Sequence, residues 1–355
     1  MFPKEALTED HFQGLGKIVP EAPGSLHVLM NAMRSQMNSG AYYVHPTADG
    51  AFPTIEEAVA QAELDHIAGS EAIVILLAQG LEHAITVAGG LIIDTTNFYY
   101  FVAAAADDNL YKAPTKISGD MDLKVTTKVS SSIRRPVIFQ NISCYGMEIT
   151  VRSGRRLVFN NIFNDNMKVH VEHGADGVDL ACINMRGEGN FAITALDLPA
   201  SPVSNFRALN SKFVGAAVVS PFWSVGGFLT IAAERCAWAI FINGTQPIFD
   251  LEGKSVSLTL LDTRMTIGAT GGTCNVFSNA TSGTCRWDGI NFLERSANVG
   301  TTPKTFVLTG PTHEKAPWVQ SGISPTGPPN GTQKFDDSDD AGSWTWLAWN
   351  GSTWV

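Results

Sequence analysis

Side chains that could do chemistry are densest in the segment His170-Val-Glu172-His173-Gly-Ala-Asp176-Gly-Val-Asp179. On a strand, His170 and Glu172 face the same side, and the glycine-rich turn can fold Asp176 or Asp179 toward them. Such a group can bind a metal ion or act as an acid/base pair. It is also typical of a solvated strand and turn, because it lacks the HExxH spacing that puts two imidazoles on one metal. We therefore expect no catalytic residue, metal site or cofactor.

Other carboxylates could pair from different parts of the fold or from different subunits. Glycoside hydrolysis needs two of them, whereas a polysaccharide lyase needs a dense carboxylate cluster for Ca²⁺ and a basic residue. No such cluster is evident in the sequence, and sequence alone does not pair the candidates. The acidic run 336–340 (DDSDD) lacks the glycine and distal glutamate of an EF-hand, which favours a solvated loop. The candidates are Glu148, Asp165, Asp262, Asp288 and Glu294.

Composition limits the class of protein. The chain has 355 residues, more than one compact core usually holds, so we expect two domains or one elongated repetitive domain. Charged residues are only 16% and hydrophobic residues 44%, which excludes a disordered or coiled-coil protein. The net charge of −10 repels phosphate backbones, so no nucleic-acid partner is expected.

Cysteine usage and the N-terminus indicate a cytoplasmic origin. The five cysteines are scattered without a zinc-binding spacing, which predicts buried free thiols, although Cys274 and Cys285 could pair. The N-terminal MFPKEALTEDH lacks the layout of a signal peptide. The 21 residues from Phe213 to Ala233 carry no charge, but Pro221 and Gly226-Gly227 divide them into strand-sized pieces. No membrane insertion is therefore expected. The remaining cysteines are Cys144, Cys182 and Cys236.

Two helices are predicted near the N-terminus. The first, at 26–37 in an arm spanning residues 1–52, follows the capping residue Ser25 and has a methionine-rich apolar face. It can lie on its own domain or dock on another protein, and we predict docking because methionine adapts to irregular grooves. The second, at 54–64, starts with a capping box formed by Thr54 and Glu57. The docking residues are Leu26, Leu29, Met30, Met33 and Met37, and the stripe of the second helix is Ile55, Ala58, Val59 and Ala62.

After the second helix the pattern changes to short strands that recur. Runs at 72–78, 84–87, 90–94 and 98–103 are apolar and β-rich. One column of apolar residues then repeats in steps of 20, 21, 26, 25, 29 and 27 residues, with asparagines shortly after it in several repeats. The column is Phe139, Phe159, Leu180, Phe206, Ile231, Leu260 and Trp287, and the asparagines are Asn141, Asn161, Asn184, Asn210 and Asn291.

A repeat of this length cannot bury its apolar edge alone and must stack on a copy of itself. We therefore predict an all-β fold, a right-handed parallel β-helix of eight to ten turns between residues 53 and 300. Aliphatic residues would line its interior, and asparagine amides would bond each other at the turns. The helix at 54–64 would cap the N-terminal end, because an open end exposes a sheet edge.

Residues 301–355 have a different character. We predict a Pro/Gly-rich connection from Pro303 to Pro329, followed by a β-hairpin at Asn350-Gly351 that places Leu347 opposite Trp354. A lone hairpin is unstable, so its tryptophans must be buried by the β-helix, another subunit or a ligand. They could stack on sugars, but oligomer packing is favoured, because aromatic residues are enriched in interface cores. These residues are Trp344, Trp346, Trp349 and Trp354.

The run from Gly50 to Ala62 (GAFPTIEEAVAQA), with the strand AIVILLA after it, resembles the opening of pectin-lyase-like β-helix proteins, including pectinesterases and bacteriophage tailspikes. The resemblance implies a first helix and first strand, and it carries no chemistry. The further pectinesterase motifs Gly-x-Tyr-x-Glu, Asp-Phe-Ile-Phe-Gly and Gly-Arg-Pro-Trp are missing. The esterase activity therefore does not transfer with the fold.

The C-terminal Trp349-Asn-Gly-Ser-Thr-Trp354 is similar to segments that end many phage virion proteins. With an arm, a β-helical shaft and an aromatic tip, the chain resembles a bacteriophage virion appendage. This implies a non-enzymatic structural protein, made in the host cytoplasm: a homotrimeric fibre, spike or capsid decoration protein. Its partners would be other virion proteins, through the N-terminal arm, and host-surface polysaccharide. The alternatives are a tailspike-like depolymerase, acting as hydrolase or lyase, and a cellular carbohydrate-active enzyme.

Overall fold

The structure is a computed structural model in which the chain divides into two compact units. The first unit comprises the chain up to Glu172 together with Asp176–Met185. The second unit comprises His173–Ala175 and Arg186–Val355. The predicted docking helix at 26–37, Trp344 and residues 337–340 lie outside the described residues. The described residues are 41–65, 72–94, 99–104, 115–124, 136–152, 154–201, 203–218, 220–243, 245–270, 273–278, 283–296, 305–319, 324–326, 328–336 and 345–355.

The described strands form parallel sheets arranged as a β-solenoid of about 7 turns. This confirms the predicted all-β parallel β-helix, with fewer turns than the eight to ten expected. The early turns are longer than the repeat suggests, because Tyr100 lies opposite Val137 on the neighbouring strand. Long connections within a turn are tolerated, since the entropic cost of closing a loop rises slowly with its length.

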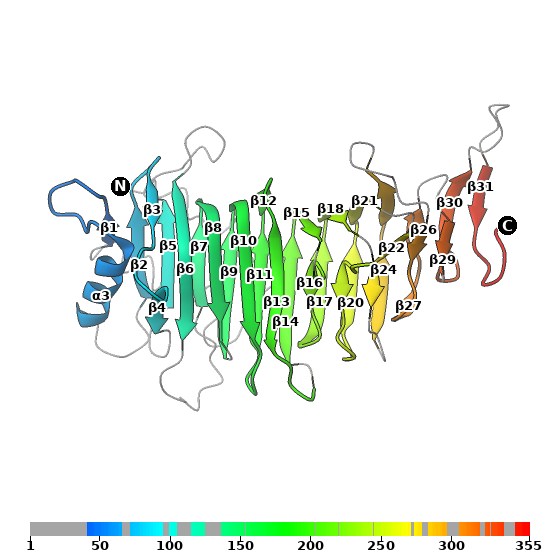
Figure 1. Cartoon of the computed structure of the whole chain (residues 1–355), viewed down its shortest axis with the longest axis horizontal. Helices are drawn as coiled ribbons and strands as arrows, with labels where there is room; N and C mark the ends of the chain where they lie inside the picture. Colours follow the sequence, from blue (N-terminus) through cyan, green and yellow to red (C-terminus); the bar gives the residue numbers. More distant parts are fainter. Residues whose placement is uncertain are drawn as a thin grey trace. The chain divides into compact units, whose positions relative to one another are not determined.

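Helix α3 (Ile55–Asp65) lies beside β1 (Tyr42–Val44) and β2 (Ala72–Leu77) of the first unit (Figure 1). The Thr54 hydroxyl accepts the N–H of Glu57 at 3.2 Å, which satisfies one free donor of the first turn. The Tyr100 hydroxyl donates to the Glu63 carboxylate at 2.6 Å and ties the helix to β5 (Tyr99–Ala104). The predicted helix is confirmed, and its whole apolar stripe is buried: Ile55, Ala58, Val59 and Ala62.

Two parallel sheets make up the first unit. The strand predicted at 84–87 lies instead at 82–84, because the polar His83 is buried and its Nε2 donates to the Ala78 carbonyl at 3.1 Å. In order, one sheet contains β1, β2, β5 (Tyr99–Ala104), β7 (Pro136–Gln140), β9 (Arg155–Asn160) and β11 (Val178–Ile183). The other contains β3 (Glu82–Ala84), β6 (Lys116–Lys124), β8 (Ser143–Val151) and β10 (Phe163–Glu172), with β4 (Leu91–Asp94) also paired to β6.

The second unit contains four sheets and the short strand β12 (Arg186–Gly187). The β14–β27 sheet contains β14 (Ser204–Leu209), β17 (Phe228–Glu234), β20 (Ser257–Leu261), β24 (Thr284–Asp288) and β27 (Thr312–Glu314). The β13–β23 sheet contains β13 (Phe191–Asp197), β16 (Trp223–Ser224), β19 (Phe249–Asp250) and β23 (Phe277–Ser278). The β15–β31 sheet contains β15 (Lys212–Ala217), β18 (Ala237–Ile242), β21 (Arg264–Ala269), β25 (Phe292–Arg295), β28 (Trp318–Val319), β30 (Gln333–Asp336) and β31 (Thr345–Ala348). The fourth contains β22 (Thr273–Asn275), β26 (Thr305–Val307) and β29 (Ser324–Thr326).

The predicted apolar column is correct in part. Phe139 pairs with Phe159, their rings stacked with centroids 5.7 Å apart, and Leu260 pairs with Trp287. Phe206 likewise pairs with Ile231. Two steps are wrong by two residues, since Cys182 lies opposite Phe159 and Leu258 lies opposite Ile231. A shift of two keeps the same side chains facing inward, so burial patterning does not reveal the error.

The predicted asparagine turns are present. Asn141, Asn161, Asn184 and Asn210 all adopt the left-handed backbone conformation, with φ between 48° and 56°. The Asn161 amide donates to the Asn141 side-chain oxygen at 2.8 Å, as an asparagine ladder requires. Asn291 is the exception, because it is buried after the turn, where its oxygen accepts the N–H and hydroxyl of Thr263.

Parallel pairing continues past residue 300. The predicted connecting chain from Pro303 to Pro329 instead contains β26, β27, β28 and β29, each paired with a strand one turn earlier. These strands are only two or three residues long. So short a run shows no clear alternation of apolar and polar residues, and the nearby prolines argue against a strand, so the sequence did not predict them. The last strand, β31, pairs antiparallel with β30 and ends the sheet.

The C-terminal hairpin is shifted from its predicted register. Trp349, and not Leu347, lies opposite Trp354. The turn starts at Asn350, whose side-chain oxygen accepts the N–H groups of Ser352 and Thr353 at 3.0 and 2.9 Å. An asparagine that bonds the backbone ahead of it favours the first position of a turn, which moves the whole pairing.

Aromatic residues fill the interior of the second unit. The Trp223 ring lies 5.0 Å from both Phe206 and Phe213 in edge-on contacts, and its N–H donates to the Phe191 carbonyl at 3.1 Å. All five cysteines are buried and free, so Cys274 and Cys285 do not pair. The described part of the uncharged segment 213–233 contains strand residues of β15, β16 and β17, and no helix in the described part of the chain could cross a membrane.

Candidate functional site

The His170 segment carries charge pairs on the outer side of β10 in the first unit. His170 and Glu172 face the same side, as predicted, between the buried Val169 and Val171. His170 Nε2 lies 3.4 Å from one oxygen of Glu148, and Lys168 Nζ lies 2.5 Å from the other. The hydrogen bond from Lys168 lowers the pKa of Glu148, so this carboxylate stays ionised.

The remaining residues of the segment have other surroundings. His173 is fully buried, with Nδ1 2.5 Å from the Ser204 hydroxyl. Asp176 is exposed in the turn, and Asp179 forms an ion pair with Arg156 on β9 at 3.2 Å. Within the described ranges, no three His, Cys, Asp or Glu side chains are grouped as metal ligands would be.

The other carboxylates of the first unit are also engaged or isolated. Glu172 forms an ion pair with Arg152. Asp165, half-buried on β10, lies opposite Tyr145 on β8. A catalytic pair needs one carboxyl group with a raised pKa beside an ionised one, whereas the pKa of Glu148 is lowered and Glu172 is bound by Arg152.

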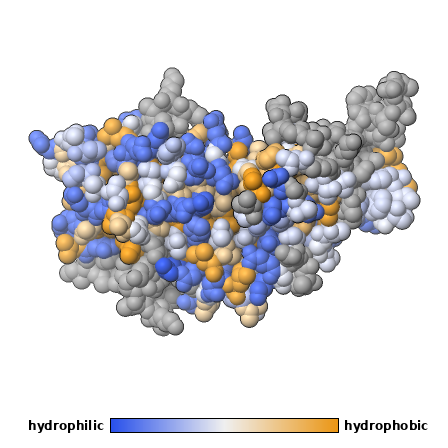
Figure 2. All heavy atoms as spheres, in the orientation of Figure 1, coloured by the Kyte–Doolittle hydropathy of each residue, from blue (hydrophilic) through white to orange (hydrophobic). Residues whose placement is uncertain are grey.

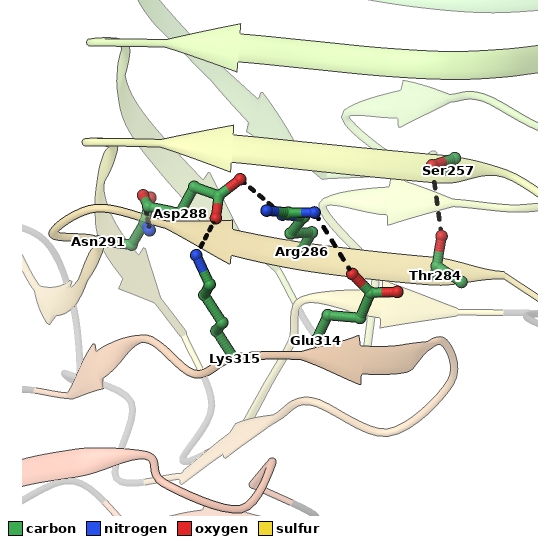
Figure 3. Close-up of polar contacts among 7 residues, drawn as sticks. All are labelled: Ser257, Thr284, Arg286, Asp288, Asn291, Glu314 and Lys315. Carbon is green, nitrogen blue, oxygen red and sulfur yellow. Dashed lines mark hydrogen bonds and ion pairs between the residues drawn. The ribbon is translucent and has the colours of Figure 1, made fainter.

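The outer face of the β14–β27 sheet in the second unit carries a column of hydroxyl and amide groups that we call the hydroxyl ladder. The Thr230 hydroxyl donates to the Asn205 side-chain oxygen at 2.7 Å. The Thr284 hydroxyl donates to Ser257 at 3.3 Å (Figure 3). Members of this column therefore hydrogen-bond to each other across neighbouring strands. The ladder is Asn205, Thr230, Ser257, Thr284 and Thr312, each directly paired with the next.

Beside the ladder, four charged residues form a network that Figure 3 shows in detail. Arg286 contacts Asp288 at 2.7 Å and Glu314 on the next strand at 3.8 Å. Lys315 binds the other oxygen of Asp288. The hydrogen bond from Lys315 lowers the pKa of Asp288, so the network consists of two cations and two anions. The formal charges of the two cations and the two anions balance one another.

Asp262 and Glu294 also have structural partners. The Asp262 carboxylate accepts the Ile290 N–H at 2.8 Å at a turn. Glu294 binds the guanidinium of Arg264, with Nη2 2.7 Å from Oε2, and accepts the Thr266 hydroxyl. Burial raises the pKa of Glu294, but the bonds from Arg264 and Thr266 outweigh it and give a net lowering.

Glu252 is the described carboxyl group with a raised pKa, and sequence reasoning missed it. Burial raises this pKa, and repulsion from Asp250 adds to the effect. The Glu252 N–H donates to Asp250 Oδ1 at 3.0 Å, and the Ser278 hydroxyl donates to the same oxygen at 3.1 Å. Ser224, Asp250 and Ser278 are directly paired on neighbouring strands of the β13–β23 sheet.

Among the described residues of the second unit, two pairs of contacting aromatic side chains reach the surface. Trp349 and Trp354 contact each other across the hairpin, with ring centroids 5.5 Å apart and both side chains half-buried. Of Trp346 the structure describes the backbone, opposite Phe335. Phe292 and Trp318 form a second pair on the β15–β31 sheet, with ring centroids 6.1 Å apart. On the face that Figure 2 shows, hydrophobic residues lie in small groups between hydrophilic ones.

No protein family, curated protein or solved structure matches this chain in sequence or structure comparison. The surface assignments therefore rest on geometry. The hydroxyl ladder had a readable signal, since its bonded members are 25 and 27 residues apart, the same period as the apolar column. The pairing of Phe292 with Trp318 had none, because the two rings belong to strands whose register sequence does not specify.

Proposed function

We propose that this chain is a structural, non-enzymatic β-solenoid protein that attaches to polysaccharide at a surface. The observation that carries the proposal is the pairing of the candidate carboxylates. Glu148, Asp288 and Glu294 are each held by cations and have lowered pKa values. Ionised, paired carboxylates cannot protonate a glycosidic oxygen. A stack of short strands instead supplies a rigid scaffold with a broad polar face.

We further propose that the protein is a bacteriophage virion appendage: a homotrimeric fibre, spike or capsid decoration protein that docks through its N-terminal arm. Support comes from the sequence resemblances at Gly50–Ala62 and Trp349–Trp354, and from the order of arm, solenoid and aromatic tip. Side-by-side solenoids can bury large faces of low charge, which agrees with a charged fraction of 16%.

The experiment is to incubate the purified full-length chain with bacterial surface polysaccharides and to measure binding and cleavage together. We expect binding without new reducing ends or unsaturated uronates. Release of oligosaccharides would refute the non-enzymatic assignment. For the virion assignment, deletion of residues 1–39 is expected to abolish incorporation into particles without changing the circular dichroism spectrum, and retention in particles would refute docking through the arm.

The alternative is a polysaccharide hydrolase, and Glu252 favours it. Its raised pKa suits a general acid, and the nearby Asp250 supplies a second carboxyl group, as glycoside hydrolysis requires. If cleavage is seen, Glu252→Gln would abolish it, whereas Glu148→Gln would leave it unchanged. Equal activity of wild type and Glu252→Gln would exclude Glu252 as the acid.

A further inference from the structure

An exposed aromatic pair lies on the outer face of the β15–β31 sheet, and we call it the aromatic platform. Phe292 on β25 and Trp318 on β28 are directly paired across neighbouring strands, with ring planes inclined by 53°. Phe292 exposes 44% of its surface, and Trp318 is half-buried. Two large rings kept at the surface of neighbouring strands indicate a face that a ligand covers.

The platform continues into a polar margin without net charge. Arg264 is directly paired with Phe292, and Thr266 is directly paired with Glu294. The Arg264 guanidinium binds both oxygens of Glu294. The pair is neutral as a whole, yet a guanidinium has five N–H groups and a carboxylate about four acceptor positions. Hydrogen-bonding capacity therefore remains for a ligand on the rings.

We propose that the aromatic platform binds a chain of neutral pyranose sugars, an inference that rests on the proposed attachment function. A pyranose presents an apolar C–H face and a rim of hydroxyls. The rings of Phe292 and Trp318 match the face, and the pair of Arg264 and Glu294 matches the rim. Because the platform supplies no uncompensated cation, it gains nothing from a charged sugar.

The spacing of the strands fixes the direction of the bound chain. Neighbouring strands lie about 4.8 Å apart, close to the length of one sugar unit in an extended glycan. A chain that runs across the strands therefore places successive sugars on Arg264, Phe292 and Trp318 in turn. A chain running along one strand would meet a single ring.

The test uses the full-length protein and two immobilised panels: neutral polysaccharides (dextran, xyloglucan and mannan) and acidic ones (polygalacturonate and alginate). Wild type is expected to bind a neutral member with equal strength at low and high salt. Phe292→Ala should weaken that binding about tenfold, as removal of a central aromatic anchor does. Phe292→Tyr should restore it, because the ring remains.

Two control variants keep the result specific. Tyr145→Ala removes an aromatic side chain that is 47% exposed in the first unit, and Thr284→Ala removes a hydroxyl of the ladder. Both are expected to bind as wild type does. Circular dichroism and thermal melting of Phe292→Ala should match wild type, because this ring lies on the outer face.

Three outcomes would overturn the inference. If wild type binds and Phe292→Ala binds equally well, the platform is not the site, while the attachment function stands. If wild type binds the acidic panel alone and loses this binding in high salt, the neutral sugar class is wrong. If wild type binds neither panel, the attachment function and the inference fail together.

Discussion

Acidification is expected to destabilise the second unit through His173. This imidazole has 0% exposure and packs edge-on against Phe228, with ring centroids 5.0 Å apart. Nδ1 lies 2.5 Å from the Ser204 hydroxyl, and Nε2 has no hydrogen-bond partner among the described residues. A protonated ring would therefore bury a charge together with an unpaired N–H.

The magnitude follows from the pKa of this group. Burial lowers the pKa of His173 from 6.5 to about 4, and attraction by Asp197 opposes the effect only in part. Above pH 6.5 the ring is neutral in both states, and no stability is lost. Between pH 6.5 and 4 the unfolded chain binds the proton and the folded chain does not, so stability falls as the pH falls. The loss approaches about 3 kcal/mol below pH 4, at 1.36 kcal/mol for each pKa unit.

The assay combines an imidazole titration by NMR with denaturant unfolding between pH 7 and 4. His173→Gln assigns the resonance and provides the reference, because glutamine does not titrate. The stability of wild type relative to this variant should be about 3 kcal/mol lower at pH 4 than at pH 7. A measured His173 pKa of 6 or above, or parallel stability curves for the two proteins, would refute the reasoning.

Three further predictions concern packing and reactivity. Gly289→Ala should lower the free energy of unfolding by about 1 kcal/mol more than Gly253→Ala does in urea titrations. Both glycines have φ near 70°, but a Cβ at position 289 would lie 2.1 Å from Asp262 Oδ1, whereas a Cβ at position 253 would meet nothing. Equal losses for the two variants would contradict this. Trp223→Ala should cost about 3–5 kcal/mol by the same measurement, because six aromatic rings of the interior surround it. A loss below about 1 kcal/mol would show that the site is not packed as described. All five cysteines are buried, and burial raises the pKa of Cys236 to about 11, so a thiol reagent at pH 8 should label none before unfolding and five after it. Labelling of the native protein would show that the interior opens.

The fold could be predicted where the sequence carries a local signal with a direct physical cause. The capping box at Thr54 and the stripe from Ile55 to Ala62 specify α3, and asparagines specify the left-handed turns. The exact stacking register could not be predicted. Leu180 was aligned with Phe159, whereas Cys182 lies opposite it, and both residues face inward. A pattern of period two does not distinguish registers that differ by two residues.

The surface sites depend on that register and were therefore largely hidden. His170 and Glu172 were found because they are two apart on one strand. The contact of Arg286 with Glu314 and that of Phe292 with Trp318 join strands one turn apart. An error of two residues in either strand would separate the partners, so sequence reasoning could name the residue types without pairing them.

Charged pairs supply the register information that apolar alternation lacks. Lys168 is directly paired with Glu148 across β10 and β8, and Arg286 with Glu314 across β24 and β27. Each pair is exposed and adds little free energy, about 0–1 kcal/mol. A slip of two residues would nevertheless keep the interior apolar and place Lys168 opposite Thr150 or Gly146, leaving Glu148 without its cation. In a chain with only 16% charged residues, the few charges thus select one stacking register among several that bury the same side chains. The pairing with Lys168 also keeps the Glu148 carboxylate ionised, so that it cannot act as a general acid. One interaction therefore both favours the stacking register and prevents acid catalysis at this position.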